Sequence, residues 1–425
     1  MREMKDSGVE WIGEIPIDWG IAKFKHFFSI IGGCGFKEEY QGESQGDYPF
    51  LKASDINGYE RTVSSAKNYV NQNLVQQEKY NVVPSYSIII AKIGEALKKN
   101  HRKINTCDCI IDNNCEAFSL IPDADSDISY LYYVLSHIDM VWFDNGGTVP
   151  SVNNEKLRDF FLPNPSNVTQ HRIAGYLDAK CAKIDRAIAR QQEAIEKLKE
   201  YKLSVITEKV TMGLNPDAPM KDSGIEWIGE IPEQWETVAF GRVAQVKSNL
   251  VDPSLYPDLP QISPESIEKD SGRLLSYSSV DESGVFSYNH YFYTGQILYS
   301  KIRPKLNKAC IAPFEGLCSA DMYPIETNAD TRFILYCIIS YSFLSQVIMV
   351  TESRVKMPKI NQSELARIMI ALPPEKQAQE LIAEYLDRFC EKLDLVLGRK
   401  KVLIDKLTEY KKAFIYEAVT GKREV

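Results

Sequence analysis

The most regular alternation of apolar and polar residues in the chain is a long helical pattern that occurs twice. From Ile173 to Thr211, apolar residues such as Leu177, Ile188 and Val205 recur at alternating steps of four and three, which is the spacing of a coiled-coil seam. The pattern returns from Ile382 to Thr420 at a shift of 209 residues. Each helix would be about 58 Å long at roughly 1.5 Å per residue. Neither is apolar enough to be stable alone, so we expect the two to pack together. The residues expected in this helix seam, which we also expect to dock partners, are Leu177, Ile184, Ile188, Ile195, Leu198, Leu386, Leu393, Leu397, Ile404 and Leu407.

The polar interruptions of the seam repeat together with its apolar positions. Gln191 matches Lys400, and Lys202 matches Lys411. Random drift would not preserve the interruptions of two unrelated helices at the same places. The two helices are therefore copies of one another.

A second repeat, built around tryptophans, precedes each helix. Residues Met4 to Trp19 (MKDSGVEWIGEIPIDW) and Met220 to Trp235 (MKDSGIEWIGEIPEQW) are identical at 13 of 16 positions. In one interpretation Trp11, Ile12 and Ile15, with their counterparts, pin a turn against the helix pair. In the other, the motif docks a partner.

About 140 residues separate each tryptophan motif from its helix. They are rich in Tyr, Phe, Ile and Val and broken by Gly, Asn, Asp and Pro, which predicts a mixed α/β domain with short strands. The predicted fold is α+β: two mixed α/β domains separated by two long helices, with a pseudo-twofold internal repeat. The expected boundaries are 1–162 for the first tryptophan motif and domain, 163–214 for the first helix, 215–371 for the second motif and domain, and 372–425 for the second helix.

The order of these segments predicts how the helices run. The first helix must carry the chain from one variable domain to the other, and the second, equally long, begins at the far domain. It can stack on the first only by running back. We therefore expect an antiparallel pair, with the two termini near each other.

Composition and charge exclude several classes of protein. The 425 residues are 44% hydrophobic and 25% charged, with a formal charge of −8, which argues against a protein that coats nucleic acid without selectivity. The N-terminus has no signal-peptide core, and the apolar runs are too short to span a bilayer, so we expect a soluble cytoplasmic protein. The nine cysteines form no CxxC pair and no zinc-like spacing, which indicates reduced thiols and no metal site.

A search for catalytic motifs finds none. GxxxxGK[ST], HExxH, GxSxG and an Asn-Pro-Pro-aromatic string are all missing from the sequence. Gly32 to Gly35 is glycine-rich without matching GxGxxG, so a tight turn or a DNA-facing loop is the better interpretation. The five histidines are scattered and have no paired carboxylates. We therefore predict no active site and no cofactor in this chain.

Two basic clusters lie at matching places in the two variable domains. At the 209-residue shift Lys92 meets Lys301 and Lys99 meets Lys308. A single charge run is usually a solvated surface, but its recurrence after a strand-like segment in an acidic protein favours contact with phosphates. The residues expected to bind DNA phosphates are Lys92, Lys98, Lys99, Arg102, Lys103, Lys301, Arg303, Lys305 and Lys308.

Reading a base sequence requires polar side chains that reach base edges in a groove. Loops near the basic clusters carry such side chains. The candidates are Lys37, Lys52, Ser54, Asp55 and Asn57 in the first domain and Lys247, Asn249, Gln261 and Ser263 in the second.

This organisation resembles the specificity subunit of type I restriction-modification enzymes. The resemblance covers the whole chain and depends on the WIGEIP-x-x-W motif at Trp11 and Trp227, and on the helix entry Pro-x-x-x-x-Gln-x-x-Ile-Ala-x-Tyr-Leu-Asp at Pro165 to Asp178. A weaker copy of the entry ends at Asp387, where Gln377 and Gln379 both fit the glutamine position.

The resemblance implies a non-catalytic subunit with two target recognition domains, each reading half of a bipartite DNA site. It implies that the helices act as a ruler and as a platform for two methyltransferase (modification) subunits, joined by restriction and translocase subunits. S-adenosylmethionine, ATP and magnesium would then belong to those partners. The assembled complex would be a DNA adenine methyltransferase and a type I site-specific deoxyribonuclease, acting in phage defence.

Other classes of function stay open at this point. One variable domain could be a degenerate nuclease or methyltransferase, although no cluster of carboxylates stands out. The chain could instead be a coiled-coil scaffold without DNA binding, or a recognition-only module of a related phage-defence methyltransferase. Salt-dependent binding to duplex DNA separates these alternatives.

Overall fold

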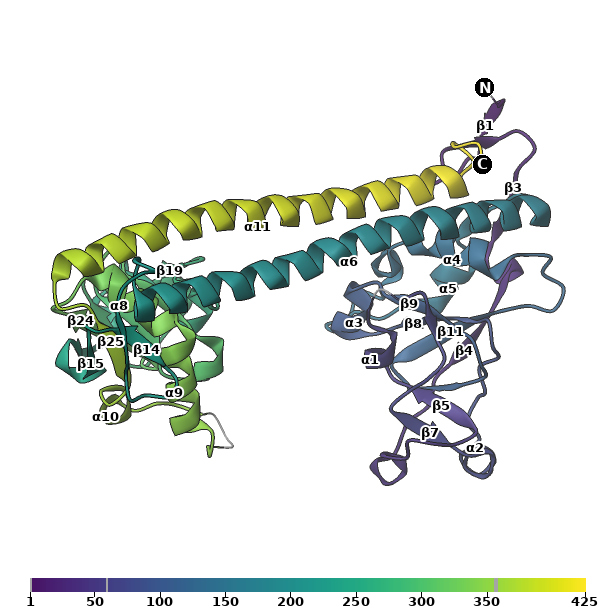
Figure 1. The fold of residues 1–425 in the computed structure, drawn as a ribbon. Coiled ribbons are helices and arrows are strands. Elements are labelled where there is room, and N and C mark those ends of the chain that lie inside the picture. The colour runs from purple at the N-terminus through teal and green to yellow at the C-terminus, as the bar shows by residue number, and fades with distance from the viewer. Residues whose placement is uncertain (1, 59, 355–357) are drawn as a thin grey trace. The chain divides into compact units, whose positions relative to one another are not determined.

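The computed structural model describes residues 2–58, 60–354 and 358–425, and it divides into two compact units. Unit 1 comprises Met1–Gln191 with Val402–Val425, and unit 2 comprises Gln192–Lys401. Two long helices, α6 (Asn167–Met212) and α11 (Lys376–Val419), each contribute one part to each unit (Figure 1).

Unit 1 is a mixed α/β unit that begins with the first tryptophan motif. Its strands are β1 (Met4–Asp6), β2 (Glu14–Pro16), β3 (Gly20–Lys23), β4 (Phe28–Gly32), β5 (Tyr48–Leu51), β6 (Thr62–Val63), β7 (Asn68–Val70), β8 (Ile88–Ala91), β9 (Arg102–Asn105), β10 (Ile110–Ile111), β11 (Cys115–Leu120) and β12 (Phe161–Asn164). Its short helices are α1 (Ala53–Ile56), α2 (Gln72–Glu78), α3 (Gly94–Lys98), α4 (Ile128–His137) and α5 (Asn154–Arg158), with 3₁₀ turns η1 (Phe24–His26), η2 (Glu38–Tyr40) and η3 (Met140–Phe143).

The largest sheet of unit 1 has five strands in the order β4-β11-β8-β9-β6. Its centre is β8, an uninterrupted apolar strand that is buried along its whole length, as expected for a strand covered on both faces. A three-stranded sheet, β10-β5-β7, contains the parallel pair β5·β10. The smaller pairs are β1-β2 and β12-β3.

Unit 2 follows the same plan with a different sequence. Its strands are β13 (Met220–Asp222), β14 (Glu230–Pro232), β15 (Glu236–Ala239), β16 (Ala244–Val246), β17 (Leu250–Val251), β18 (Pro260–Ile262), β19 (Ser278–Ser279), β20 (Asn289–Phe292), β21 (Ile297–Ser300), β22 (Ala309–Ile311), β23 (Gly316–Cys318), β24 (Met322–Thr327) and β25 (Met369–Leu372). Its short helices are α7 (Val280–Ser283), α8 (Thr331–Ile339), α9 (Tyr341–Thr351) and α10 (Gln362–Leu365), with 3₁₀ turns η4 (Phe240–Arg242), η5 (Pro253–Leu255), η6 (Pro264–Ser266) and η7 (Pro304–Leu306).

The sheets of unit 2 correspond to those of unit 1. The order β16-β24-β21-β22 matches β4-β11-β8-β9, and the sheet β17-β20-β23-β18-β19 contains the parallel pair β18·β23 that corresponds to β5·β10. The predicted fold class is therefore confirmed: two mixed α/β domains of one architecture, each packed on long helices.

The two long helices are antiparallel in both units, as their order in the chain predicts. In unit 1 the Tyr176 and Phe414 rings stack with centroids 5.6 Å apart, and Lys411 Nζ lies 2.7 Å from Asp185 Oδ1. Residue numbers rise along α6 as they fall along α11, so the helices run in opposite directions (Figure 1). In unit 2 the equivalent pair is Lys202 Nζ with Asp394 Oδ1, at 2.8 Å.

Burial agrees with the predicted helix seam, whereas docking of partners by the same residues stays a prediction. All ten predicted seam residues are buried or half-buried, and Leu177 and Leu386 are fully buried. Two of the residues that interrupt the seam, Lys202 and Lys411, form ion pairs with the opposite helix, and they are equivalent at the 209-residue shift. Ion pairs at seam positions fix the register of a helix pair because any slip separates both partners.

We expect Asp394→Ala to destabilise unit 2 by on the order of 1 to 2 kcal/mol, because it leaves the ammonium of Lys202, whose side chain is 6% exposed, without its carboxylate. The cost stays below that of a fully enclosed pair because Asp394 itself is 21% exposed. Urea denaturation monitored by circular dichroism measures the change. The double variant Lys202→Met with Asp394→Leu is the control and should recover most of the loss. If it is as unstable as the single variant, the ion pair is not the cause.

The start of each long helix is tied to the domain by one glutamine. Gln170 Oε1 accepts a hydrogen bond of 2.9 Å from Asp127 N, and Gln379 Oε1 accepts one of 2.9 Å from Asp330 N. Each aspartate in turn caps the following helix, α4 or α8. Gln379, not Gln377, is therefore the counterpart of Gln170.

The tryptophan motifs pack in the core, as one of the two interpretations expects. Ile12, Ile15 and Trp19 are at most 2% exposed and belong to the same apolar cluster as the end of α11. Tyr416 Oη donates a hydrogen bond of 3.1 Å to Ile12 O. The N- and C-termini lie near each other in unit 1 (Figure 1). In the second motif Trp227 is 42% exposed, so its side chain lies at the surface.

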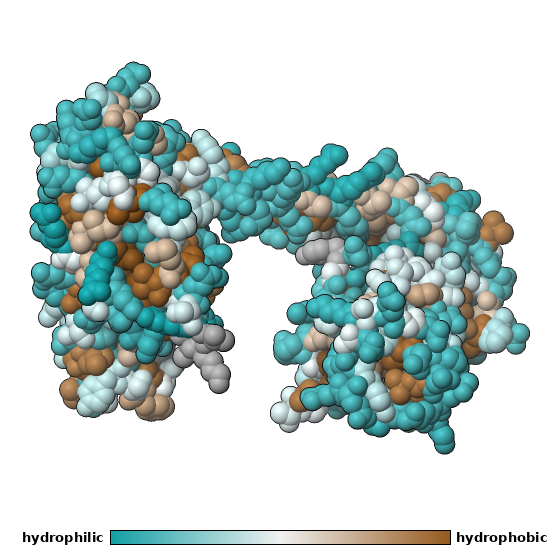
Figure 2. All heavy atoms as spheres, turned by 60° about the horizontal axis from the view of Figure 1, so that its bottom comes forward, coloured by the Kyte–Doolittle hydropathy of each residue, from teal (hydrophilic) through white to brown (hydrophobic). Residues whose placement is uncertain are grey.

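Among the described residues, no single helix is long and apolar enough to cross a membrane. Helices α8 and α9 reach the required length and hydropathy only as a pair bent by 57°, and their apolar residues form part of the core of unit 2. Hydrophilic residues cover most of the face seen in Figure 2.

Candidate nucleic-acid interface

In both units a polar turn follows the parallel strand pair. In unit 1 Leu51 pairs with Ile111, and in unit 2 Ile262 pairs with Cys318. The residues that follow, Lys52 and Ser263, therefore come directly after equivalent strands. Each of these two residues begins a capped helical turn, α1 or η6. Several of the predicted base-reading residues are on or beside these turns: Lys52, Ser54, Asp55, Asn57, Gln261 and Ser263.

In each unit a second turn is hydrogen-bonded to the first residue of the basic cluster. In unit 1, Asn114 O accepts a hydrogen bond of 2.8 Å from Lys92 N, and in unit 2, Asp321 O accepts one of 3.0 Å from Lys301 N. Both turns also bond back to the parallel strand, through Asp112 N to Leu51 O in unit 1. The structure therefore brings Lys92 and Lys301, the first residues of the two basic clusters, to the same strand ends as Lys52 and Ser263.

The two predicted base-reading lysines of unit 1 flank one loop. Lys52 Nζ donates to Gln41 Oε1 at 2.8 Å and lies 5.4 Å from the centre of the Phe36 ring. Lys37 Nζ is 2.9 Å from Glu78 Oε1. The glutamate, through its hydrogen bond, raises the pKa of Lys37, so the lysine stays charged. The loop from residue 36 to 41 is closed by a hydrogen bond of 3.2 Å from Gln41 Nε2 to Phe36 O. It therefore carries one cation, Lys37, and has the second, Lys52, against its closed base.

The predicted readers of unit 2 are spread over neighbouring strands. Lys247 is exposed and lies 3.3 Å from Glu326, and Asn249 O accepts a hydrogen bond of 2.8 Å from Tyr291 N on β20. Gln261 is on β18, which shares the sheet with β20 through β23. Their role in reading bases stays a prediction.

The predicted phosphate contacts separate into outward-facing and inward-facing residues. Lys98, Lys99, Arg303 and Lys305 are exposed. Lys92 is half-buried, 3.4 Å from the buried carboxylate of Glu116. Two further lysines donate to backbone carbonyls: Lys301 to Ala320 O at 2.6 Å and Lys308 to Pro264 O at 2.7 Å.

The prediction for Arg102 is wrong in this structure, and Lys103 is buried as well. Both residues are on β9, inside the five-stranded sheet, and are at most 6% exposed. The Arg102 guanidinium donates to the carbonyl oxygens of Leu135 and Ile138, and burial lowers its pKa to about 10. Its donors hold α4 in place, so they cannot also bind a phosphate.

The structure assigns a role to the aspartate that ends each helix-entry motif. Asp178 Oδ1 accepts a hydrogen bond of 2.7 Å from Tyr133 Oη and pairs with Arg61. Asp387 Oδ1 accepts one of 2.7 Å from Tyr336 Oη, and its Oδ2 lies 2.8 Å from Arg332. The two arginines, Arg61 and Arg332, are at different positions in the two repeats. Comparison of the repeats could therefore not reveal these contacts of the aspartates.

The glycine-rich stretch is not a tight turn, so that interpretation is wrong. Gly32 ends β4, and Gly33 and Cys34 continue its pairing through hydrogen bonds to Cys115 O and Ile111 O. The other interpretation, a DNA-facing loop, stays a prediction. A Cβ atom on Gly33 would lie 1.8 Å from Asp112 O, and Cys34 forms a β-bridge with Asp112. Burial, and then the charge of Asp112, raises the pKa of Cys34 to about 11. The thiol therefore stays protonated at neutral pH.

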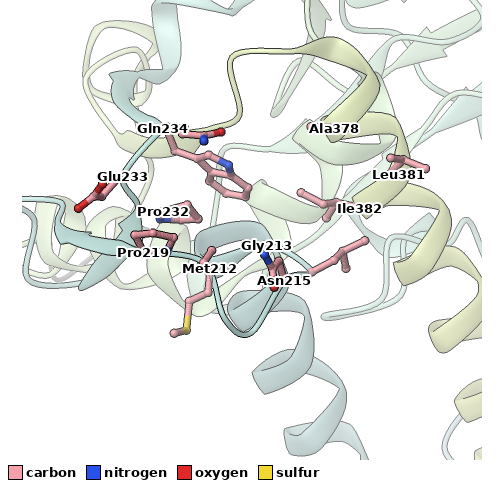
Figure 3. A pocket seen from close by; sticks show the side chains of 13 residues that line it. Met212, Gly213, Asn215, Pro219, Pro232, Glu233, Gln234, Ala378, Leu381 and Ile382 are labelled. Atoms are coloured by element: carbon pink, nitrogen blue, oxygen red, sulfur yellow. The ribbon is translucent and has the colours of Figure 1, made fainter.

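A cavity of about 330 Å³ lies in unit 2 where α6 ends. Figure 3 shows Met212, Pro232 and Ile382 around it, so its walls come from both long helices and the second tryptophan motif. Trp235 approaches Gly213 so closely that a Cβ atom there would be 3.1 Å from the ring. The cavity is lined mainly by apolar side chains and lies on the helix side of the unit.

These features define a class of protein: two units of one architecture, with different polar side chains at the same strand ends, connected by a helix pair. A family model for the type I restriction modification DNA specificity domain matches residues 16–199 and 232–404. Because these matches cover more than half of the chain, the chain belongs to that family.

Curated relatives and solved structures agree with this assignment. The specificity subunit of the type I restriction enzyme EcoDI from Escherichia coli is 27% identical over 417 residues, covering 93% of this chain and 87% of that protein. The MjaIX specificity subunit from Methanocaldococcus jannaschii is 23% identical over 424 residues, covering 92% of each. A chain from a structure of type I R-M complex assembly has a TM-score of 0.65 at 15% identity, covering 95% of this chain and 98% of that one, which shows the same fold.

Proposed function

We propose that this chain recognises the DNA sequence for a type I restriction-modification complex and is not itself a catalyst. The observation that carries the proposal is the repeated edge in each unit, where one backbone frame presents different side chains. Ser263 stands in unit 2 where Lys52 stands in unit 1. A shared frame with divergent polar groups is what two domains need in order to bind the same kind of ligand and to read different base sequences.

The target is a bipartite and asymmetric DNA site. Each unit reads one half-site, and because the units differ in sequence, the half-sites differ. Outward-facing cations such as Lys99 and Arg303 contact phosphates and give affinity without sequence information. The polar side chains on the neighbouring turns supply the sequence information.

The partners are two modification subunits together with restriction subunits. Apolar residues outside the helix seam support docking on the long helices: Leu395 is 57% exposed in unit 2, and Val402 and Tyr410 are 52% and 54% exposed in unit 1. S-adenosylmethionine binds the modification subunits, and ATP and magnesium serve the restriction subunits. The assembled complex is then a DNA adenine methyltransferase and a site-specific deoxyribonuclease.

Co-expression with a cognate modification subunit tests this function. We expect the purified complex to methylate adenines within one bipartite sequence, mapped by sequencing of modified bases, while the chain alone neither methylates nor cuts DNA. Specific binding should weaken steeply as salt rises, because phosphate contacts release counterions. A scaffold without DNA binding would show no salt-dependent association, with or without the partner, and that result would overturn the proposal.

A further inference from the structure

In unit 2 a second chain segment is attached beside the basic turn η7. The segment leading into α10 passes the end of β21, where Lys359 forms an antiparallel bridge with Ile302. Next to it, Arg303 N donates a hydrogen bond of 2.9 Å to Pro358 O. Lys359 is therefore held directly beside Arg303, although 56 positions separate them in the sequence.

The backbone of Arg303 is held in a conformation that most residues avoid. Its φ of 46° and ψ of 57° are left-handed, which is sterically costly for a residue with a Cβ. The hydrogen bond from the Arg303 N–H to Pro358 O holds it there. Strained residues of this kind persist where the surrounding structure holds a side chain in a required place.

Three cationic residues lie on these two joined segments. Arg303, Lys305 and Lys359 are all exposed. Within the described parts of unit 2, no carboxylate lies within ion-pairing distance of any of them, and the nearby Arg354 is the residue that neutralises Glu364. Like charges that gather with no acid between them form a site for an anion.

The corresponding place in unit 1 has the same frame but fewer free charges. Ser151 takes the position of Lys359, in a bridge with Ile93. Of the nearby lysines, Lys98 lies 2.5 Å from Glu95 and Lys92 lies 3.4 Å from Glu116. The frame therefore repeats, whereas the three-cation cluster belongs to unit 2.

We propose that Lys359, together with Arg303 and Lys305, binds the phosphate backbone of the half-site read by unit 2. The inference rests on the proposed function. It adds Lys359, which lies outside the basic run that the sequence analysis identified between Lys301 and Lys308. Three cations on two joined segments hold the duplex more firmly than the run alone, because the added lysine gives one more contact with a phosphate. Phosphate contacts of this kind set the register of a domain on DNA without reading bases.

The test uses the full chain in complex with its modification subunits and a duplex carrying the mapped recognition sequence. Binding is measured by fluorescence anisotropy over a series of salt concentrations. Lys359→Ala should weaken binding several-fold and reduce the slope of log affinity against log salt by about one unit. Lys359→Arg, which keeps the charge, should restore both. Lys376→Ala removes another exposed lysine, at the start of α11, and is the matched control, with the slope unchanged.

The outcomes separate this inference from the proposed function. If the wild-type complex binds with a steep salt dependence and Lys359→Ala has the same slope as wild type, the inference alone is overturned. An altered methylated sequence at an unchanged slope would overturn it too, because that result marks a base-reading residue. If the wild-type complex shows no salt-dependent binding, the proposed function fails and the inference fails with it.

Discussion

A complex in which both long helices are lengthened by one turn is expected to methylate DNA at a wider spacing, or to lose methylation. Four residues inserted in α6 and four in α11, where each helix passes from one compact unit to the other, add roughly 6 Å to each helix. That is nearly two base pairs at about 3.4 Å each. Loss of methylation would also follow from the longer helices, because a spacer longer by two base pairs places the second half-site at a different angle around the duplex axis. Mapping of methylated sites in cells that carry the variant and its modification subunit gives the answer.

The ion pairs supply the control for this experiment. Asp185 with Lys411 belongs to unit 1 and Lys202 with Asp394 belongs to unit 2, so matched insertions between them leave both pairs intact. An insertion in α6 alone makes the two helices unequal between the pairs, and at least one pair is lost. We expect the single insertion to lower the unfolding midpoint and the double insertion to preserve it. Full methylation at the original spacing by the double variant would rule out the ruler.

The sequence predicted the helices and the repeat because those features are set by local periodicity. Seam positions such as Leu177 and Leu386 follow a spacing that can be counted along the chain. The polar interruptions were recognised as repeated, but their partners were not. Lys202 and Lys411 pair with aspartates on the other helix, and the choice of aspartate depends on a register that only three-dimensional packing fixes.

Burial of the basic residues could not be predicted in the same way. Arg102 and Lys99 belong to one basic run, yet Arg102 is on a strand inside a sheet whereas Lys99 follows a surface helix. Charge alone does not separate them, because a guanidinium with enough backbone acceptors is accommodated in a core. Lys359 was not predicted, because it lies outside the basic run. Its place beside Arg303 comes from a β-bridge between distant segments, which the local pattern of the sequence does not show.

The tryptophan motifs were recognised as repeats, and their packing against the helix ends explains why small residues stop those helices. At the end of α11, Gly421 has a φ of 72°, and a Cβ atom there would lie 2.5 Å from two atoms of the Pro16 ring and 3.0 Å from Trp19. At the end of α6, Gly213 has a φ of 76° and a milder approach, 3.1 Å, to Trp235. Glycine is needed at both places, and the need is greater at Gly421.

We therefore expect Gly421→Ala to destabilise unit 1 by about 2 to 4 kcal/mol. Roughly 1 kcal/mol comes from placing a Cβ in a left-handed conformation, and about 1 to 3 kcal/mol comes from overpacking against a rigid proline ring. The tryptophan motif, which joins the N-terminus to the end of α11, would then separate from the helix. Thermal and urea unfolding of the full chain measure the change, and Gly213→Ala should give a smaller loss.

Gly175→Ala is the matched control for this substitution, since it makes the same chemical change inside α6 of the same unit. An added Cβ at Gly175 meets nothing within 4 Å, and alanine is favoured over glycine within a helix by about 0.5 to 1 kcal/mol. We expect Gly175→Ala to raise the unfolding midpoint while Gly421→Ala lowers it. If the two variants shift the midpoint in the same direction, the contact of the first tryptophan motif with the end of α11 does not stabilise unit 1.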